Sequence, residues 1–465
     1  MPVCPTGAVH EVGLDDLFFS TTDAKGVITS ANEVFVRLSR FSQEELLHAP
    51  HNIIRHPAMP GGAFRAMWDT ITSGQVFACY VRNLAADGSE YDVFATITPL
   101  RDGSYLSVRT RPVCEELLST ALSIYGGARK VEDRALAQGS TRREAAQLGA
   151  AHIVRTVKGL GLEDYEAFQN TALPAEVARR EELGATWPER PFASGPLGTM
   201  LRTVTDLNED LGAWTKRQDE LADLAGSLRA ASHRLSHALA PARLTNESVS
   251  LLAHEGPQVS QLTELLRLWL QMQGIVSQQV DRLVRDLALM ERSVGRMRLR
   301  IALARLHASI TASFIAERID SQDAPGVHSA AELSHGAVGQ LTQALEDGIA
   351  ELARHSAQHQ RLAAQTTQAI AQAQRVLTIP RQLLLMWSSS PAAQDPSLPL
   401  LAQQLSQDIT QATHSSAQAL AELSELAARC QALAVVESTE ALRQHVVELG
   451  EDLTDYEELA SRSGL

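Results

Sequence analysis

Residues 50–60, Pro-His-Asn-Ile-Ile-Arg-His-Pro-Ala-Met-Pro, are the stretch that decides how the N-terminal part of this chain folds. The run lies between two segments with helical signals. Before it, residues 43–47 follow Ser42, which can cap a helix and has Glu45 three residues later, as a capping box requires. After it, residues 61–72 carry apolar side chains at helical spacing, namely Phe64, Met67, Trp68 and Ile71. The run therefore connects two predicted short helices.

Strand signals surround these helices. Alternating and β-branched residues mark five segments, at residues 17–20, 27–30, 76–84, 90–100 and 104–110. The first two flank the turn Asp23-Ala-Lys-Gly26, and the last three are joined by Asp87-Gly88 and Asp102-Gly103, which are typical of hairpins. We therefore predict one α+β domain over residues 16–112.

Beyond residue 112 helical signals dominate. Residues 113–185 are predicted to form linker helices, and a Pro- and Gly-rich segment, Thr186–Gly198, follows them. Residues 200–320 are predicted to form long helices with a break at Gly256-Pro257. Within them, side chains alternate at spacings of four and three, with one polar interruption at Gln273. This is a heptad seam, and its members are Leu262, Leu266, Trp269, Gln273, Val276, Val280, Leu283, Leu287, Met290, Val294, Met297 and Ile301.

The seam is followed by a returning helix. A loop-forming sequence at residues 321–326 separates it from residues 329–377, where a second seam includes Val338, Leu341, Leu345, Leu352 and Leu362. Two long helices around a short break predict an antiparallel hairpin. Two further helices are expected within residues 399–463. The fold class is therefore an α+β domain followed by an all-α, long-helix antiparallel coiled-coil region.

Charge and composition exclude several function classes. The chain has 41 Lys and Arg against 55 Asp and Glu, a formal charge of −14, which disfavours nucleic acid and anionic membranes as partners. Its four cysteines have no metal-binding or disulfide spacing. The N-terminus lacks the features of a secretory signal, and the longest apolar segment, residues 262–276, is interrupted by charge. We therefore expect a cytoplasmic protein without a membrane span.

Histidines offer the nearest approach to a reactive site in the helical region. His233 and His237, and likewise His355 and His359, stand four residues apart on one helix face, but no third metal ligand is nearby. Ser236-His237 resembles a phospho-acceptor motif, yet Ala238 stands where an acidic base is needed. With no nucleophile, acid–base pair or phosphate loop in evidence, we expect structural histidines and no enzymatic activity.

A series of short motifs runs through residues 18–112 in a fixed order: Ser20-Thr-Thr-Asp23, Gly26-Val-Ile-Thr29, Ala31-Asn32, Gln43-Glu-Glu-Leu46, Pro50 to Pro57, Met59-Pro60, Met67-Trp68, Arg82-Asn83 and Arg109-Thr-Arg111. In this order they resemble a PAS domain, and more narrowly the flavin-binding PAS domain of bacterial aerotaxis and energy-taxis receptors. The resemblance implies a five-stranded antiparallel sheet with short helices over one face. It also implies FAD in the cleft between them, with the redox state of the ring as the stimulus.

A flavin site needs polar groups toward the ring and the phosphates, and an apolar sleeve around the ring. The predicted cofactor-binding residues are Asn32, Asn52, Arg55, His56, Trp68, Phe77 and Asn83, with Phe35 and Ile54 as further apolar groups. Three positions depart from the family pattern: Ala58 replaces an acidic residue, Phe77 a tryptophan, and Asp92 an aromatic residue. Haem, or a cleft without ligand, are the alternatives to FAD.

The resemblance predicts a redox or oxygen sensor that signals through its coiled coil, to the chemotaxis or energy-taxis machinery. A homodimer and a helical partner, such as a chemoreceptor or a kinase complex, are expected. The kinase-binding tip of a chemoreceptor hairpin has no counterpart here; the nearest segment, residues 298–312, lacks its asparagines and glutamates. The alternatives are a dimerisation or scaffold protein with a ligand-free PAS domain, and a flavin-dependent enzyme.

Overall fold

The computed structural model describes residues 3–241, 243–322, 328–390, 393, 395–435 and 439–463. The chain divides into two compact units. The first contains residues 1–215, 295–353 and 439–465, and the second contains residues 216–294 and 354–438.

The first unit contains the predicted five-stranded antiparallel sheet, which is confirmed. Its strands are β1 (Phe18–Thr22), β2 (Ile28–Ala31), β3 (Phe77–Leu84), β4 (Glu90–Pro99) and β5 (Tyr105–Thr110). They lie side by side in the order β2-β1-β5-β4-β3, and every pair is antiparallel. The first strand and the last in the sequence are therefore neighbours in the centre of the sheet, which closes the domain on itself.

Short helices cover the inner face of this sheet. They are α1 (Glu33–Ser39), α2 (Gln43–Leu46), the 3₁₀ turn η1 (His51–Ile54) and α3 (Gly61–Ile71). The capping box of Ser42 and Glu45 is present at the start of α2. Phe18 and Phe35 stack with ring centroids 5.5 Å apart, and Phe18 lies 6.3 Å from Tyr91. These rings anchor α1 to the sheet.

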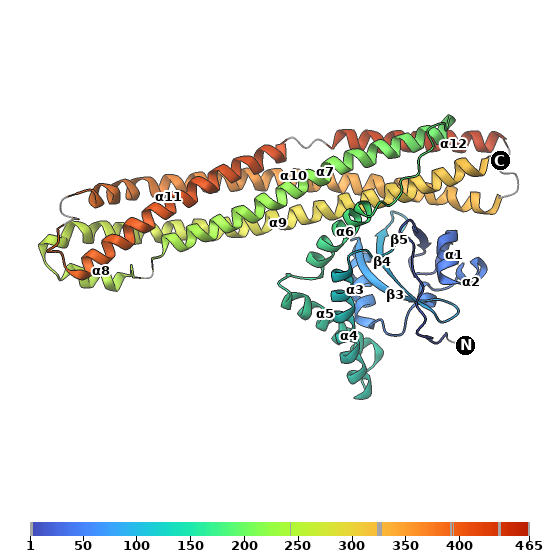
Figure 1. Cartoon of the computed structure of the whole chain (residues 1–465), viewed down its shortest axis with the longest axis horizontal. Helices are drawn as coiled ribbons and strands as arrows, with labels where there is room; N and C mark the ends of the chain where they lie inside the picture. The colour runs from blue at the N-terminus through green and yellow to red at the C-terminus, as the bar shows by residue number, and fades with distance from the viewer. Residues whose placement is uncertain are drawn as a thin grey trace. The chain divides into compact units, whose positions relative to one another are not determined.

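Three more helices pack on this domain: α4 (Glu115–Ala137), α5 (Arg142–Gly159) and α6 (Tyr165–Glu182). They belong to the same compact unit as the sheet, and α3, α4 and α5 lie side by side (Figure 1). Helix α6 covers the outer edge of β3, because Gln169 accepts a hydrogen bond from Ala78 N (3.1 Å) and the Tyr165 hydroxyl donates one to Ala78 O (3.3 Å). Residues 113–185 thus do more than link: they complete the surface of the α+β domain.

Long helices make up most of the remaining chain. They are α7 (Gly195–Leu239), α8 (Asn246–Ala253), the 3₁₀ turn η2 (Pro257–Val259), α9 (Ser260–Gln322), α10 (His328–Ser388), α11 (Leu400–Val435) and α12 (Glu440–Ser463). Every apolar member of the seam from Leu262 to Ile301 is buried, and Gln273 is half-buried. The second seam, from Val338 to Leu362, is buried as well. Residues 323–326 of the predicted loop lie outside the described residues.

The long helices pack on one another in the second unit, and one of them packs on the sheet in the first. In the second unit, Gln374 donates to Leu420 O (3.3 Å) and Gln360 donates to Ala434 O (3.0 Å), so α10 and α11 run in opposite directions. In the first unit, Phe314 of α9 makes an edge-on contact with Phe19 of β1, with centroids 5.3 Å apart. The outer face of the sheet therefore packs directly on a long helix.

One helical stretch, Pro257–Ser321, is long and apolar enough to cross a membrane, judged by length and composition. The expectation from the sequence counted uninterrupted apolar residues and therefore did not single it out as a span. In the structure 78% of its most apolar window is buried. Core helices of soluble proteins meet the same criterion, so the finding is weak evidence for a membrane span.

Candidate ligand-binding cavity

A cavity of about 290 Å³ lies between the inner face of the sheet and helix α3. From β5 the cavity is lined by every second residue, Tyr105, Ser107 and Arg109, as the period of a β-strand requires. From β3 the alternate residues Phe77, Cys79, Val81 and Asn83 line it, together with Tyr80. The sheet therefore forms one wall of the cavity and fixes the positions of its polar groups.

Helix α3 supplies the apolar side of the cavity through Phe64, Met67, Trp68 and Ile71. The Trp68 ring stands edge-on to Tyr105, with centroids 5.6 Å apart. Gly26, also in the lining, has a φ of +79°, and a Cβ at this position would lie 3.0 Å from the Trp68 ring. Glycine here allows the β1–β2 turn to approach the indole closely.

Arg109 is a buried cation in the lining, only 5% exposed. Its guanidinium donates to Ser20 Oγ (3.1 Å) and to His51 Nε2 (2.5 Å). Since arginine only donates, Nε2 of His51 accepts and the proton sits on Nδ1. Burial lowers the pKa of Arg109 to about 10, and burial together with the Arg109 charge lowers the pKa of His51 well below its ordinary value. His51 is therefore neutral beside a charged arginine.

Asn83 is a buried amide, 2% exposed, that also lines the cavity. Within the described part of the chain its Nδ2 has no hydrogen-bond partner. An unpaired buried donor costs about 1–3 kcal/mol. A ligand with an acceptor at this place would remove that cost.

Arg55 and Asn52 enter the cavity from the run at residues 50–60. The Arg55 guanidinium lies 4.0 Å from the centroid of the Phe64 ring and donates to Met59 O (3.2 Å). Burial lowers the pKa of Arg55, although Glu132 acts in the opposite direction. Arg55 thus keeps its cation at the cavity wall by stacking on an aromatic ring.

The structure brings six of the predicted groups to the cavity: Asn52, Ile54, Arg55, Trp68, Phe77 and Asn83. Asn32 and Phe35 are not among the lining residues. Asn32 is the N-cap of α1: its Oδ1 accepts from Phe35 N (3.2 Å) and Phe19 N (3.1 Å), and its Nδ2 donates to Leu17 O (2.9 Å). Both polar atoms of this amide are used within the fold, and the structure places Asn32 outside the cavity.

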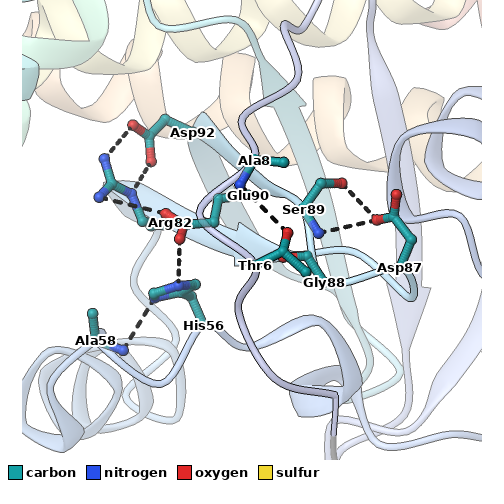
Figure 2. A network of polar contacts seen from close by, with 10 residues as sticks. All are labelled: Thr6, Ala8, His56, Ala58, Arg82, Asp87, Gly88, Ser89, Glu90 and Asp92. Atoms are coloured by element: carbon teal, nitrogen blue, oxygen red, sulfur yellow. Dashed lines mark hydrogen bonds and ion pairs between the residues drawn. The ribbon is translucent and has the colours of Figure 1, made fainter.

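His56 also lies away from the cavity, in the network shown in Figure 2. Its Nδ1 accepts from Ala58 N (3.1 Å), and its Nε2 lies 3.4 Å from Glu90 Oε1. Asp92, the position expected to be aromatic, forms a two-point ion pair with Arg82, with both N···O distances 2.8 Å. His56 therefore anchors the run at residues 50–60 to the sheet.

Sequence reasoning missed His51, Arg109, Tyr105, Met59 and Tyr125 as cavity residues. For β5 a signal existed, since Tyr105, Ser107 and Arg109 alternate along one strand. His51 stands within the distinctive run itself. Tyr125 belongs to α4, far outside the predicted domain, and no local pattern marks it.

Two polar links join the cavity region to the helices that follow it. The Tyr125 and Tyr165 hydroxyls lie 3.3 Å apart, which connects α4 to α6. The Tyr80 hydroxyl donates to Glu176 Oε1 (2.7 Å), and Val113 N donates to the other carboxylate oxygen (2.7 Å). Glu176 thereby holds the exit from β5 against α6.

Cys79 also lines the cavity. Burial raises the pKa of its thiol to about 12, which disfavours the reactive thiolate at neutral pH. Over the described residues, no group of three or more His, Cys, Asp or Glu side chains is placed to hold a metal ion.

The sheet order, the helices over one face and the cavity between them define a PAS domain. The family model for the PAS fold matches residues 28–110. Residues 28–110 therefore form a PAS domain within a longer, mostly helical chain.

Among curated proteins, the chain is 41% identical over 107 residues to the aerotaxis receptor of Escherichia coli K12, which is 22% of this chain and 21% of that receptor. It is 33% identical over 81 residues to the nitrogen fixation regulatory protein of Klebsiella pneumoniae, covering 17% of this chain and 16% of that protein. The chain thus matches about a fifth of these relatives or less, in the PAS region.

The PAS region is also similar to domains of solved structures. A PAS domain from Colwellia psychrerythraea is 19% identical, covering 20% of this chain and 85% of that one, with a TM-score of 0.18. A fungal LOV domain photoreceptor is 19% identical, covering 23% of this chain and 81% of that one, with a TM-score of 0.19.

Proposed function

We propose that this chain is a sensor protein whose PAS domain binds a flavin, FAD in the first instance, and relays a redox or oxygen stimulus through its helices. The observation that carries the proposal is the cavity itself. It combines an apolar wall with a buried, unpartnered amide donor at Asn83 and a buried cation at Arg109. The aerotaxis receptor to which this region is similar is a sensor by its name.

The lining residues suit a flavin in kind. Small-molecule pockets usually measure about 300–1,000 Å³, so the cavity is of a size for a ring system rather than for the whole of FAD. Trp68 and Phe77 would form the apolar sleeve, Asn83 would donate to a ring carbonyl, and the cations Lys25 and Arg55 suit phosphates. The flavin, when bound, would supply the electron-transfer chemistry that no side chain here provides.

The route from ligand to output runs through α3 and α4. Helix α3 forms the apolar wall, and Tyr125 of α4 lines the cavity too. A change in the ligand that displaces α3 or Tyr125 would therefore shift α4 directly, and through its packing α5 and α6. Packed helices switch between discrete arrangements rather than deforming continuously, so such a bias can travel along them.

The other parts of the proposal concern setting and partners. We place the protein in the cytoplasm, without enzymatic activity, as a homodimer that meets a helical partner such as a chemoreceptor or a kinase complex. The seam of α9 is buried within the chain, so a homodimer would use a different surface. Cross-linking of the full chain in solution, read by mass, tests the dimer.

The test of the ligand is the absorption spectrum of the purified full-length protein, followed by acid extraction and reconstitution with FAD. We expect flavin bands. Asn83→Ala should weaken FAD binding about tenfold, because the donor worth about 1–3 kcal/mol is lost. Arg82→Ala, on the same strand but paired with Asp92 outside the cavity, is the matched control and should bind as the wild type does.

Other spectra would change the assignment. A haem band would keep the sensor and make a gas its stimulus. The absence of any chromophore, even after incubation with FAD, would favour a scaffold protein with a ligand-free PAS domain.

A further inference from the structure

Arg109 has no acidic partner in the part of the chain that the structure describes. Its hydrogen-bond partners, Ser20 and His51, are neutral, and its guanidinium also faces the Phe18 and Phe35 rings at 5.3 and 5.6 Å. Two more exposed arginines, one in β3 and one in the β4–β5 turn, differ in this respect. Arg82 is paired with Asp92, and Arg101 with Asp347.

A buried cation without a carboxylate is costly for the fold. Removing an ion from water costs several kcal/mol even after relaxation, and neutral hydrogen bonds and aromatic faces offset only part of that. Burial lowers the pKa of Arg109 to about 10, which still leaves it charged at neutral pH. The apo fold therefore carries a positive charge at the cavity that its own side chains do not balance.

The surroundings hold this charge in position. The neutral His51 ring can only accept at Nε2, and it stacks on Phe35 with centroids 5.8 Å apart. Ser20 fixes a second guanidinium nitrogen. Because β1 and β5 pair at Phe18 and Arg109, the strand register itself sets where the guanidinium enters.

We propose that Arg109, positioned by His51 and Ser20, is the specificity-determining residue of the cavity and recognises an electron-rich edge of the ligand, carbonyl or anionic. This inference rests on the proposed function: in a flavin, that edge is the pyrimidine side of the ring. Reduction adds electron density to the same edge, and the reduced ring is an anion over part of the neutral pH range. Arg109 then binds the reduced ring more tightly than the oxidised ring.

The experiment measures the affinity of the full-length protein for riboflavin and for FAD, each oxidised and each reduced by dithionite under nitrogen. Riboflavin isolates the ring from the phosphates. Wild type, Arg109→Met and Arg109→Lys are compared, with Arg82→Met as the control. We expect Arg109→Met to lower the ratio of reduced to oxidised affinity about tenfold, which lowers a two-electron midpoint potential by about 30 mV.

The melting temperature of the ligand-free protein supplies a second readout. Replacing an arginine with a purely structural role would destabilise the fold. Replacing a buried cation that has no counter-charge would not, because the cost of burying the charge disappears with it. We expect ligand-free Arg109→Met to melt at or above the wild-type temperature, and Arg109→Lys to restore part of the affinity ratio. Arg82→Met should leave the ratio unchanged.

Two results would overturn the inference: an unchanged affinity ratio in Arg109→Met with binding retained, or a ligand-free melting temperature lower by about 4 °C or more. A wild type that binds no flavin defeats the proposed function instead. In that case the ligand-free melt decides alone. If ligand-free Arg109→Met melts no lower than the wild type, Arg109 remains a recognition residue for another electron-rich ligand. If it melts lower, Arg109 has a structural role and the inference fails.

Discussion

Glu132 shows at the scale of one residue how the helices beyond the PAS domain hold its cavity wall. Its carboxylate is buried, 3% exposed, and accepts hydrogen bonds from Gly61 N (2.8 Å) and Gly62 N (2.7 Å). These are the first two amides of α3, which lack partners within the helix. A residue of α4 thus caps the helix that lines the cavity, and the negative charge suits the positive end of the helix dipole.

Glu132→Gln should lower the free energy of unfolding by about 1–3 kcal/mol, since one of the two capping oxygens becomes a donor facing another donor. Urea denaturation measures the change. Glu144→Gln is the matched control, because Glu144 closes an exposed capping box at Thr141 and should cost about 0.5 kcal/mol. Equal losses in the two variants would contradict a special role for the buried cap.

The roles of individual side chains in the site were the hardest feature to predict from the sequence. Asn32 and His56 have the right chemistry for a ligand, but the fold uses them as a helix cap and an anchor. Arg109 and His51 became visible as a pair only through the pairing of β1 with β5 and the position of η1. The residue type predicts which chemistry a side chain can provide, whereas its burial and its hydrogen-bond partners decide whether that side chain is available to a ligand.

At the scale of elements, α3 and α5 approach so closely that their backbones nearly touch. A Cβ on Gly62 would lie 2.3 Å from Ala150 N and 2.5 Å from the carbonyl carbon of Gly149. Only glycine fits at that crossing, since backbone atoms cannot move aside as a flexible side chain would.

Gly62→Ala should therefore separate α3 from α5 and destabilise the first unit by about 1–3 kcal/mol, as overpacking does. Gly126→Ala is the control: it lies inside α4 with no atom within 4 Å of a new Cβ, so it should raise stability by up to about 1 kcal/mol. Chemical denaturation of both variants measures whether the free energy of unfolding falls in Gly62→Ala and rises in Gly126→Ala. A neutral Gly62→Ala would show that the crossing can relax.

Elements with a strong period were predictable. The strands alternate, and the seam of α9 keeps its spacing for about forty residues, so both are found where the sequence indicates them. The packing of α4 to α6 on the sheet could not be predicted from the sequence. It depends on Gly62 meeting Gly149 and on Glu176 meeting Tyr80, and neither contact leaves a periodic trace in the sequence.

At the scale of the whole molecule, the long helices bury two histidines. His307 of α9 is 1% exposed and His359 of α10 is fully buried. Desolvation lowers the pKa of each to about 4. Both rings are therefore neutral in the folded chain, whereas in the unfolded chain they would take up a proton near pH 6.5.

This difference makes the molecule acid-sensitive. As pH falls from about 6.5 to 4 the unfolded chain binds more protons than the folded one, so stability is lost over that interval, on the order of 3 kcal/mol per histidine. His307→Met and His359→Met should each flatten the dependence of the denaturation midpoint on pH between 7.5 and 5, in the direction that burial predicts. His414→Met, at an exposed position of α11, should leave it unchanged. If the denaturation midpoint depends on pH in the same way in all three variants, the acid sensitivity does not come from His307 and His359.

Tyr125 lines the cavity from a helix that follows the last strand of the sheet. This has a consequence for protein engineering. A chimaera that fuses residues 1–112 to the output of another protein would leave one wall of the cavity open to solvent. A junction after Glu182 would carry the complete pocket, with Tyr125, Glu132 and Glu176 in place. A transplanted sensor module of this kind should therefore include the helices α4 to α6 that wrap it.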